Sequence, residues 1–147
     1  MKERFKTFTV LIAKINRNIK RIKNQEMAEY GLRSVHVTCL YYLYGAASLT
    51  ATELCELCEE DKATISRTLD YLEKNGYLTC QTKAQKRYKS PLVLTEKGRL
   101  VGKEISEKID SIFASSDPGL NEEERALFYR ALTVISDNLE KCVKDAL

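Results

Sequence analysis

Apolar residues recur at alternating spacings of three and four near both ends of the chain. They fall at Phe5, Phe8, Ile12, Ile15, Ile19 and Ile22, and again at Phe128, Leu132, Ile135, Leu139, Cys142 and Ala146. This spacing places the side chains along one side of a helix, as in the seam of a helix pair. The pattern predicts a long helix at each end, the first of which stops near Gly31.

Two short amphipathic helices are predicted next. The first has Ser34 as its N-cap and ends between Gly45 and Ser48. Its apolar face consists of Val37, Leu40, Leu43, Tyr44 and Ala47. The second begins at Thr50, because the Thr hydroxyl and the Glu53 carboxylate three residues later form a capping box. Its apolar face consists of Ala51, Leu54, Leu57 and Cys58.

A further helix is expected to begin at Asp61, a good N-cap residue, and to end at Asn75 and Gly76. Its inward face consists of Ile65, Leu69 and Leu72. The few residues around Glu59 and Glu60 join it to the helix before it. Two short helices joined by so few residues predict a helix-turn-helix.

The spacing of the apolar residues changes after this helix. Tyr77 to Thr82 and Tyr88 to Thr95 are rich in β-forming residues, and the basic polar stretch from Lys83 to Arg87 separates them. Pro91 is tolerated because both strands of a two-stranded ribbon are edge strands. Thr95 then caps another helix, and Asn121 with its Glu three residues later caps the last one. The expected fold class is mainly α with a small two-stranded β wing (α+β).

On the helix that begins at Asp61, small and polar side chains lie opposite the buried stripe. They are Ala63, Ser66, Arg67, Asp70 and Lys74, with Thr64 at the flank. Arg67 suits a guanine edge, and Ala63 suits a thymine methyl group. An acid repels phosphate, so we expect Asp70 to orient Arg67 or to pair with Arg87. Taken alone, this face is equally typical of an ordinary solvated helix surface.

The predicted hairpin adds a second signal. It carries Lys83, Lys86, Arg87 and Lys89, with Tyr88 among them and no acid between them. Such a cationic tip suits contact with a phosphate backbone or a minor groove. The two features together favour DNA binding. The alternative is a winged-helix module that binds a protein partner and no DNA, and the basic wing argues against it.

Three segments carry a resemblance to a known family. They are LTATEL at 49–54, DKATISRTLDYLEKNGYL at 61–78 and LTEKG at 94–98. Together with the order of elements, they resemble the MarR family of winged helix-turn-helix transcriptional regulators across nearly the whole chain. The chain departs from the family at the wing tip, where Lys86 replaces the usual acid before the Arg and Tyr88 replaces the second Arg.

The resemblance implies a homodimer that binds a palindromic operator of double-stranded DNA, as a repressor that a small aromatic effector or an oxidant releases. We expect an N-terminal dimerisation helix over 1–30, a winged helix-turn-helix DNA-binding lobe over 31–95 and C-terminal dimerisation helices over 96–147, all within one compact structural domain. Expected dimer contacts are Phe5, Phe8, Ile12, Ile15, Ile19, Phe128, Leu132, Ile135 and Leu139. Expected DNA contacts are Thr50, Lys62, Ala63, Thr64, Ser66, Arg67, Lys74, Lys83, Lys86, Arg87, Tyr88 and Lys89.

Composition excludes other classes of protein. A chain of 147 residues with 44% hydrophobic content suits one compact domain. The apolar run from Phe8 to Ala13 is too short for a signal peptide or a membrane span, so we expect a cytoplasmic protein with its five Cys reduced. A single His and the lack of a glycine-rich phosphate loop or a nucleophile elbow predict no enzyme and no cofactor.

Cysteines and tyrosines leave two questions open. Cys55 and Cys58 form a CxxC pair, and His36 and Cys39 on the preceding helix complete a set that imitates a zinc site. Small buried thiols are the favoured interpretation, thiol-based redox sensing comes next, and a metal site comes last. Clustered on one helix, Tyr41, Tyr42 and Tyr44 are compatible with an aromatic effector, although core or interface packing is commoner.

Overall fold

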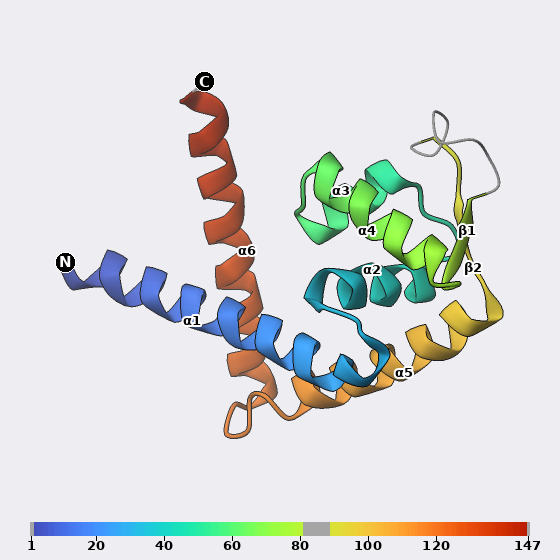
Figure 1. Cartoon of the computed structure of the whole chain (residues 1–147). Coiled ribbons are helices and arrows are strands. Elements are labelled where there is room, and N and C mark those ends of the chain that lie inside the picture. Colours follow the sequence, from blue (N-terminus) through green and yellow to red (C-terminus); the bar gives the residue numbers. More distant parts are fainter. Residues whose placement is uncertain (1, 81–88, 147) are drawn as a thin grey trace. The chain divides into compact units, whose positions relative to one another are not determined.

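The computed structural model of the protein describes residues 2–80 and 89–146 (Figure 1). In chain order its elements are α1 (Lys2–Glu26), η1 (Ala28–Tyr30), α2 (Ser34–Gly45), α3 (Ala51–Cys58), α4 (Lys62–Lys74), β1 (Leu78–Cys80), β2 (Leu92–Leu94), α5 (Glu96–Ala114) and α6 (Glu122–Asp145). The fold class is therefore the expected one, mainly helical with a two-stranded sheet. Of the helices that the structure describes, none combines the length and the apolar content that crossing a bilayer requires.

The chain divides into two compact units, Met1–Ser111 and Ile112–Leu147. The first unit holds α1 to β2 and most of α5, and the second holds the end of α5 and α6. The division into 1–30, 31–95 and 96–147 concerns the roles of these segments and stays a prediction.

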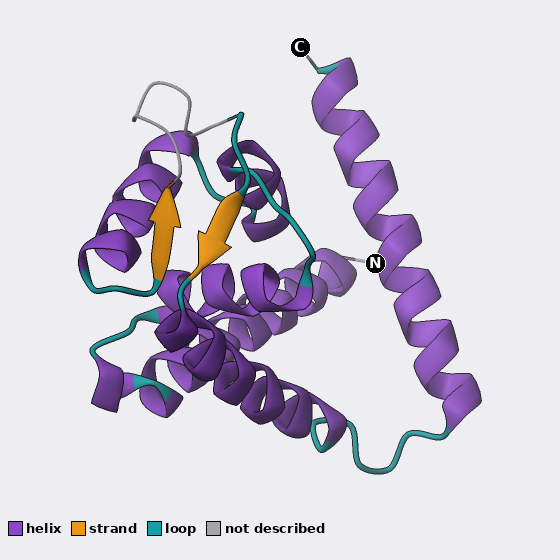
Figure 2. Cartoon of the chain, turned by 90° about the vertical axis from the view of Figure 1, so that its right-hand side faces the viewer, coloured by secondary structure: helices purple, strands orange, loops and turns teal. Residues whose placement is uncertain are grey.

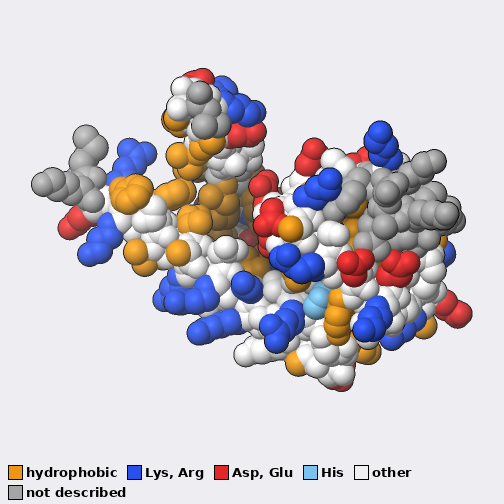
Figure 3. Space-filling view, turned by 45° about the horizontal axis from the view of Figure 1, so that its top comes forward, with side chains coloured by type: hydrophobic (Ala, Val, Ile, Leu, Met, Phe, Trp, Pro, Cys, Tyr) orange, Lys and Arg blue, Asp and Glu red, His pale blue; other side chains and the backbone are white. Residues whose placement is uncertain are grey.

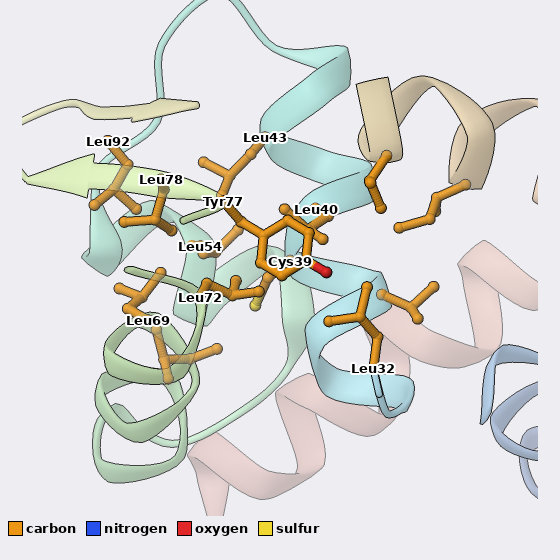
Figure 4. Close-up of a cluster of buried hydrophobic side chains, with 14 of the residues drawn as sticks. Leu32, Cys39, Leu40, Leu43, Leu54, Leu69, Leu72, Tyr77, Leu78 and Leu92 are labelled. Carbon is orange, nitrogen blue, oxygen red and sulfur yellow. The ribbon is translucent and has the colours of Figure 1, made fainter. Parts of the chain in front are cut away.

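The core of the first unit lies among α2, α3, α4 and the hairpin. Figure 4 shows the side chains of these elements pointing toward one another, with Cys39, Leu40 and Tyr77 near the centre. Burial of a Leu or Ile side chain contributes roughly 1.5–3 kcal/mol to folding. The core therefore fixes the helix-turn-helix and the hairpin as one body.

The sheet is a small antiparallel ribbon (Figure 2). Leu78 pairs with Leu94, and Cys80 pairs with Leu92. The segment between α2 and α3 joins it, because the backbone N–H of Leu92 donates to the carbonyl of Leu49 at 2.8 Å. This bridge fixes the start of the helix-turn-helix against the base of the wing.

Side-chain contacts attach α5 to the rest of the first unit. Tyr41 Oη donates to Asp110 Oδ1 at 2.9 Å, and Tyr30 Oη donates to Glu104 Oε2 at 2.7 Å. The bond to the carboxylate raises the pKa of Tyr30 to about 12. These contacts hold η1 and α2 against α5.

Three expectations about helix boundaries and faces were wrong in detail. The first helix ends at Glu26, and Gly31, with φ of 70°, instead ends the short helix η1. Ser34 is the first residue of α2, and its N-cap is Arg33. Tyr44, Ala47 and Leu57 are exposed, although they were expected on the buried faces of their helices.

The second unit is built on α6. Asn121 caps this helix by accepting from the backbone N–H of Glu124 at 2.9 Å, as the sequence predicts. Arg125 and Asp117 form an ion pair with 2.6 Å between Nε and Oδ2, which ties the preceding loop to the first turn. Within the described part of α6, no side chain is buried in the single chain.

Candidate nucleic-acid interface

A tight turn between α3 and α4 creates the helix-turn-helix. At the start of α3, Thr50 Oγ1 accepts from the backbone N–H of Glu53 at 3.2 Å, and the backbone N–H of Thr50 donates to the Glu53 carboxylate at 2.9 Å. At the end of α3, Glu59 adopts φ of 52°, in the left-handed region. That conformation lets the chain reverse within three residues before α4 begins.

The anchoring of α4 agrees with the sequence prediction. Asp61 Oδ1 accepts from the backbone N–H of Thr64 at 2.6 Å. This hydrogen bond holds the pKa of Asp61 below its ordinary value. Ile65, Leu69 and Leu72 are each 0% exposed, so the buried stripe holds the helix against the core.

The opposite face of α4 points away from the core. Ala63, Arg67, Asp70 and Lys74 are exposed, and Thr64 and Ser66 are half-buried beside them. Arg67 Nη2 lies 3.4 Å from Thr64 Oγ1, which is a weak contact that leaves most of the guanidinium available. A small, a hydroxyl and a guanidinium side chain therefore occupy the first turns of the outward face.

The remaining predicted contact residues fall into two groups. Lys62 and Lys89 are exposed, and Thr50 is half-buried at the start of α3. The oxygen of Thr50 already accepts from Glu53, which leaves its hydroxyl proton for an outside acceptor. The wing-tip residues Lys83, Lys86, Arg87 and Tyr88 lie outside the described residues.

A junction between α4, β1 and α5 positions the wing, and the sequence did not reveal it. Thr95 Oγ1 donates to the carbonyl of Gly76 at 2.5 Å and accepts from the backbone N–H of Gly98 at 3.0 Å. A Cβ at Gly98 would lie 1.9 Å from the carbonyl oxygen of Tyr77, which is too close for any other residue. The Thr and the Gly of the LTEKG segment thus hold the end of α4 against the start of α5.

Charge on the first unit is mixed. In the face that Figure 3 presents, Lys, Arg, Asp and Glu side chains are interspersed over the unit that holds α2 to α4. Hydrophobic side chains gather along α1 and along α6 in the same view. Any preference for nucleic acid must therefore come from specific positions rather than from a uniformly basic surface.

Comparison with known proteins agrees with this geometry. A sequence profile described as the MarR family matches residues 30–87, which contain the helix-turn-helix. The crystal structure of the transcriptional regulator PA3341 has a TM-score of 0.79 and 27% identity, over 91% of this chain and 98% of that one. The chain is thus similar to the MarR family in its helix-turn-helix region.

Other relatives extend the likeness over most of the chain. An uncharacterized HTH-type transcriptional regulator from Bacillus cereus is 27% identical over 122 residues, which cover 82% of this chain and 81% of the relative. The transcriptional regulator SlyA shares the fold with a TM-score of 0.81 at 23% identity, over 95% of this chain and 99% of that one. MepR of S. aureus, solved as a complex with DNA, shares the fold with a TM-score of 0.79 at 21% identity, over 90% of this chain and 96% of that one. MarR proteins are transcriptional regulators and not enzymes.

The protein has a cavity of about 630 Å³ beside α1. The basic side chains that line it are Lys20, Lys23 and Arg33, and the acids are Glu59 and Glu60. Lys23 is half-buried and donates from Nζ to Thr38 Oγ1 at 2.9 Å. The cavity therefore lies next to the turn that precedes α4.

His36 and the cysteines do not form the imagined zinc set. His36 stacks on Tyr71 with ring centroids 4.3 Å apart and accepts from the backbone N–H of Arg33 at 3.0 Å. Burial, followed by the nearby Arg33 charge, lowers the pKa of His36. The part of the chain that the structure describes contains no group of three or more potential metal ligands.

Sulfur contacts differ from the CxxC expectation. Cys58 Sγ lies 3.9 Å from Cys39 Sγ, on the neighbouring helix α2. Cys39 is fully buried, and Cys55 and Cys58 are half-buried. Sequence spacing singled out Cys55 with Cys58, but the contact across the two helices joins Cys58 to Cys39.

The three neighbouring tyrosines of α2 have different roles. Tyr41 packs edge-on against Tyr42 with centroids 5.6 Å apart, and its hydroxyl is bound to Asp110. Tyr44 lies over Gly102, where an added Cβ would come within 2.9 Å of the Tyr44 Cβ. Packing within the first unit therefore accounts for much of this cluster.

Proposed function

We propose that the chain is a sequence-specific DNA-binding repressor that acts as a homodimer on a palindromic operator. One observation carries the proposal: α4 is anchored by a fully buried stripe while Ala63, Ser66 and Arg67 lie on its opposite side, near the start of the helix. A helix held in this way can enter a major groove without unfolding any part of the core. MepR, which shares the fold, was solved as a complex with DNA, and this supports DNA as the partner of the present chain.

Readout of base edges would come from the first turns of α4. Arg67 can donate two parallel hydrogen bonds to O6 and N7 of guanine, and Ala63 can contact a thymine methyl group. Thr64 and Ser66 can bond either to bases or to phosphates, and Lys62 and Lys74 are placed to reach phosphates. Thr50, at the start of α3, would bind a phosphate through its free hydroxyl proton.

The wing would supply contacts outside the major groove. Three residues separate the end of α4 from β1, which pairs with β2. The segment between β1 and β2 carries Lys83, Lys86 and Arg87 with Tyr88, followed by Lys89. These cations suit the phosphate backbone or the minor groove.

Dimerisation would cover the apolar seams of α1 and α6. In the single chain Phe5 is 77% exposed, Ile15 49%, Phe128 45% and Leu139 55%. An amphipathic helix is stabilised mainly by burying its apolar side, and seams with spacings of three and four are the pattern that pairs helices. A second copy of the chain is the partner that this repeat fits.

Repression would follow from occupation of a promoter, which excludes RNA polymerase. A ligand or an oxidant would release the repressor by favouring a conformation that fits the operator less well. The cavity beside α1 offers a place for a small aromatic effector with a negative charge, since the three cations Lys20, Lys23 and Arg33 outnumber the two acids among its lining residues. Titration of the DNA complex with benzoate, a simple aromatic carboxylate, is a first test of such release.

Selection of bound sequences from random DNA tests the proposal as a whole. We expect a palindrome whose half-sites are about one helical turn apart. Affinity for the selected duplex should fall steeply between about 50 and 200 mM salt, because binding displaces counterions from the phosphates. Failure to enrich any sequence, with affinity that does not depend on salt, would favour the protein-interaction alternative.

Replacement of Arg67 tests the role of the recognition helix. We expect Arg67→Ala to weaken binding to the selected operator by about 1–3 kcal/mol, roughly 5- to 150-fold, and to relax selection at one base pair. Lys103→Ala is the matched control, because Lys103 is an exposed cation on α5. Fluorescence anisotropy of labelled operator DNA measures both. Equal losses in the two variants would mean that only net charge matters.

Asp70 provides a separate test of the same face. If Asp70 orients Arg67 or pairs with Arg87, as proposed, Asp70→Ala should change operator affinity or selectivity at the base pair that Arg67 contacts. Unchanged binding would contradict this role for Asp70.

A further inference from the structure

Two cysteine sulfurs from different helices lie in contact near the turn of the helix-turn-helix. Cys39 Sγ of α2 is 3.9 Å from Cys58 Sγ, at the C-terminus of α3. Neither residue belongs to the proposed DNA-contacting face, and the contact is not needed for the readout described above. Thiols at this distance can be joined by a small local movement, because a disulfide brings the sulfurs to about 2.05 Å.

The two thiols differ in access. Cys58 is half-buried and lines the cavity of about 630 Å³ beside α1. Cys39 is 0% exposed and is not among the residues that line this cavity. A small oxidant that enters the cavity therefore meets Cys58 first.

The surroundings favour the thiolate at Cys58. The hydrogen bond from the Cys39 thiol is the largest influence and lowers the pKa of Cys58, and the Lys23 charge acts in the same direction. Burial and the Glu60 charge oppose the shift. The same hydrogen bond, together with burial, raises the pKa of Cys39. Cys58, which also lines the cavity, is thus the nucleophile, and the fully buried Cys39 is the thiol that remains protonated.

We propose that Cys39 and Cys58 form an oxidisable dithiol, in which the Cys58 thiolate attacks a hydroperoxide that enters through the cavity. The Cys58 thiolate bonds to the terminal oxygen of the hydroperoxide, and the O–O bond breaks. This gives a sulfenic acid at Cys58, and the other oxygen leaves as alkoxide or hydroxide, which takes up a proton to become an alcohol or water. The Cys39 sulfur then attacks the Cys58 sulfur. Its proton leaves with the hydroxyl group as water, and the disulfide forms. One hydroperoxide is reduced by two electrons, and the two thiols supply them.

Location gives the disulfide a consequence for DNA binding, and this step rests on the proposed function. Cys58 is the last residue of α3, and Asp61, which caps α4, follows only three residues later. A bond that draws Cys58 toward α2 pulls on the turn at Glu59, which holds the left-handed conformation. Oxidation would therefore reorient α4 relative to the rest of the unit and lower operator affinity.

Mass-spectrometric peptide mapping of the full-length chain, with no DNA present, tests the chemistry. The reduced protein is treated with cumene hydroperoxide or hydrogen peroxide and digested without reductant. We expect a Cys39–Cys58 disulfide as the first product. A first disulfide that contains Cys55, sulfenic acid forming at Cys39, or no thiol loss in a tenfold excess of oxidant would each overturn the proposal.

Single substitutions separate the roles of the two sulfurs. Cys39→Ala should leave a sulfenic acid at Cys58 that dimedone traps, and Cys58→Ser should leave Cys39 unmodified. Cys55→Ser is the matched control on the same helix and should form the disulfide as the unmodified chain does. Circular dichroism checks folding. The map of the unmodified chain decides the question even if a variant does not fold.

Substitution of Lys23 provides a further test, because the pH profile of Cys58 alkylation would not change if Lys23 had only a structural role. Lys23→Met should shift the pH profile of Cys58 alkylation toward higher pH, because the cation that favours the thiolate is lost. Lys20→Met removes an exposed cation that lines the same cavity and should leave the profile unchanged. Equal profiles for Lys23→Met and the unmodified chain would contradict the role of Lys23.

Operator binding before and after oxidation tests the consequence. If the reduced chain does not bind DNA, the proposed function fails. The peptide map still shows whether Cys39 and Cys58 form a disulfide. If the reduced chain binds, we expect oxidation to weaken binding roughly 5- to 150-fold, which dithiothreitol reverses. The Cys58→Ser variant should show no such loss. Equal affinity of the reduced chain and the mapped disulfide form would overturn the regulatory consequence.

Discussion

Thr95 and Gly98 together connect the end of α4 to the start of α5. The Thr95 hydroxyl caps α5 by accepting from Gly98 and also donates to the carbonyl of Gly76 at the end of α4. The close approach of the Tyr77 carbonyl leaves no room for a side chain at position 98. One hydroxyl and one missing Cβ therefore set the relation of α4 to α5.

Gly98→Ala should destabilise the protein by about 1–3 kcal/mol, because the added carbon forces backbone atoms apart. Gly45→Ala is the matched control, since nothing lies within 4 Å of an added Cβ there. Urea denaturation followed by circular dichroism gives both free energies of unfolding. A Gly98→Ala variant as stable as the Gly45→Ala variant would show that the junction can accommodate a Cβ without a loss in the free energy of unfolding.

At the level of the element, α4 depends on its cap and on its buried stripe. Asp61 receives the backbone N–H of Thr64, and Leu69 and Leu72 fill the core behind the helix. Capping and stripe together determine which side chains face outward. The position of Arg67 therefore follows from residues that never contact DNA.

The cap also makes the stability of the protein depend on pH. The pKa of Asp61 is lowered in the folded state, mainly by the hydrogen bond from Thr64. Its stabilisation is therefore fully present above the unfolded-state pKa of about 3.9 and is lost as pH falls through the lower, folded value. We expect Asp61→Asn to keep the cap and to flatten the dependence of the urea midpoint on pH below about pH 5.

Asp61→Ala separates capping from charge, because it removes both. It should lower the urea midpoint at neutral pH, which Asp61→Asn should change far less. If Asp61→Asn retained the full acid dependence of the unmodified chain, carboxylates elsewhere would have to account for it.

On the scale of the whole molecule, the exposed apolar side chains of the second unit indicate that a partner covers them. Phe128, Ile135 and Leu139 lie on one side of α6 and are exposed in the single chain. Exposed apolar positions in a continuous stripe indicate an interface rather than a solvent-facing surface. The proposed homodimer supplies the missing cover.

Leu139→Glu should therefore convert the dimer to a monomer. Two unpaired carboxylates in the interface should raise the dissociation constant of the dimer at least roughly 100-fold. Thr133→Glu adds the same charge on the opposite side of α6 and should leave the dimer intact. Sedimentation equilibrium measures both variants. A Leu139→Glu variant that remained dimeric would remove α6 from the interface, and operator binding of a stable monomer would contradict the proposed mechanism.

Much of the fold and of the candidate site was predictable from the sequence. Caps at Thr50, Asp61 and Asn121 were expected and are confirmed, and so is the burial of Ile65, Leu69 and Leu72. Boundaries were less reliable. The first helix ends before Gly31, and Ser34 lies inside α2. The roles in DNA binding and dimerisation stay predictions.

The sequence by itself determined the helices, the turn between α3 and α4 and the outward face of α4. These features depend on hydrogen bonds and side-chain periodicity within about four residues along the chain. Only the tertiary structure decided that Cys58 meets Cys39, that Leu49 bridges to Leu92 and that Gly98 lies against Tyr77. Such contacts join residues that are distant in sequence, and their geometry is set by how whole elements pack, which no local pattern encodes.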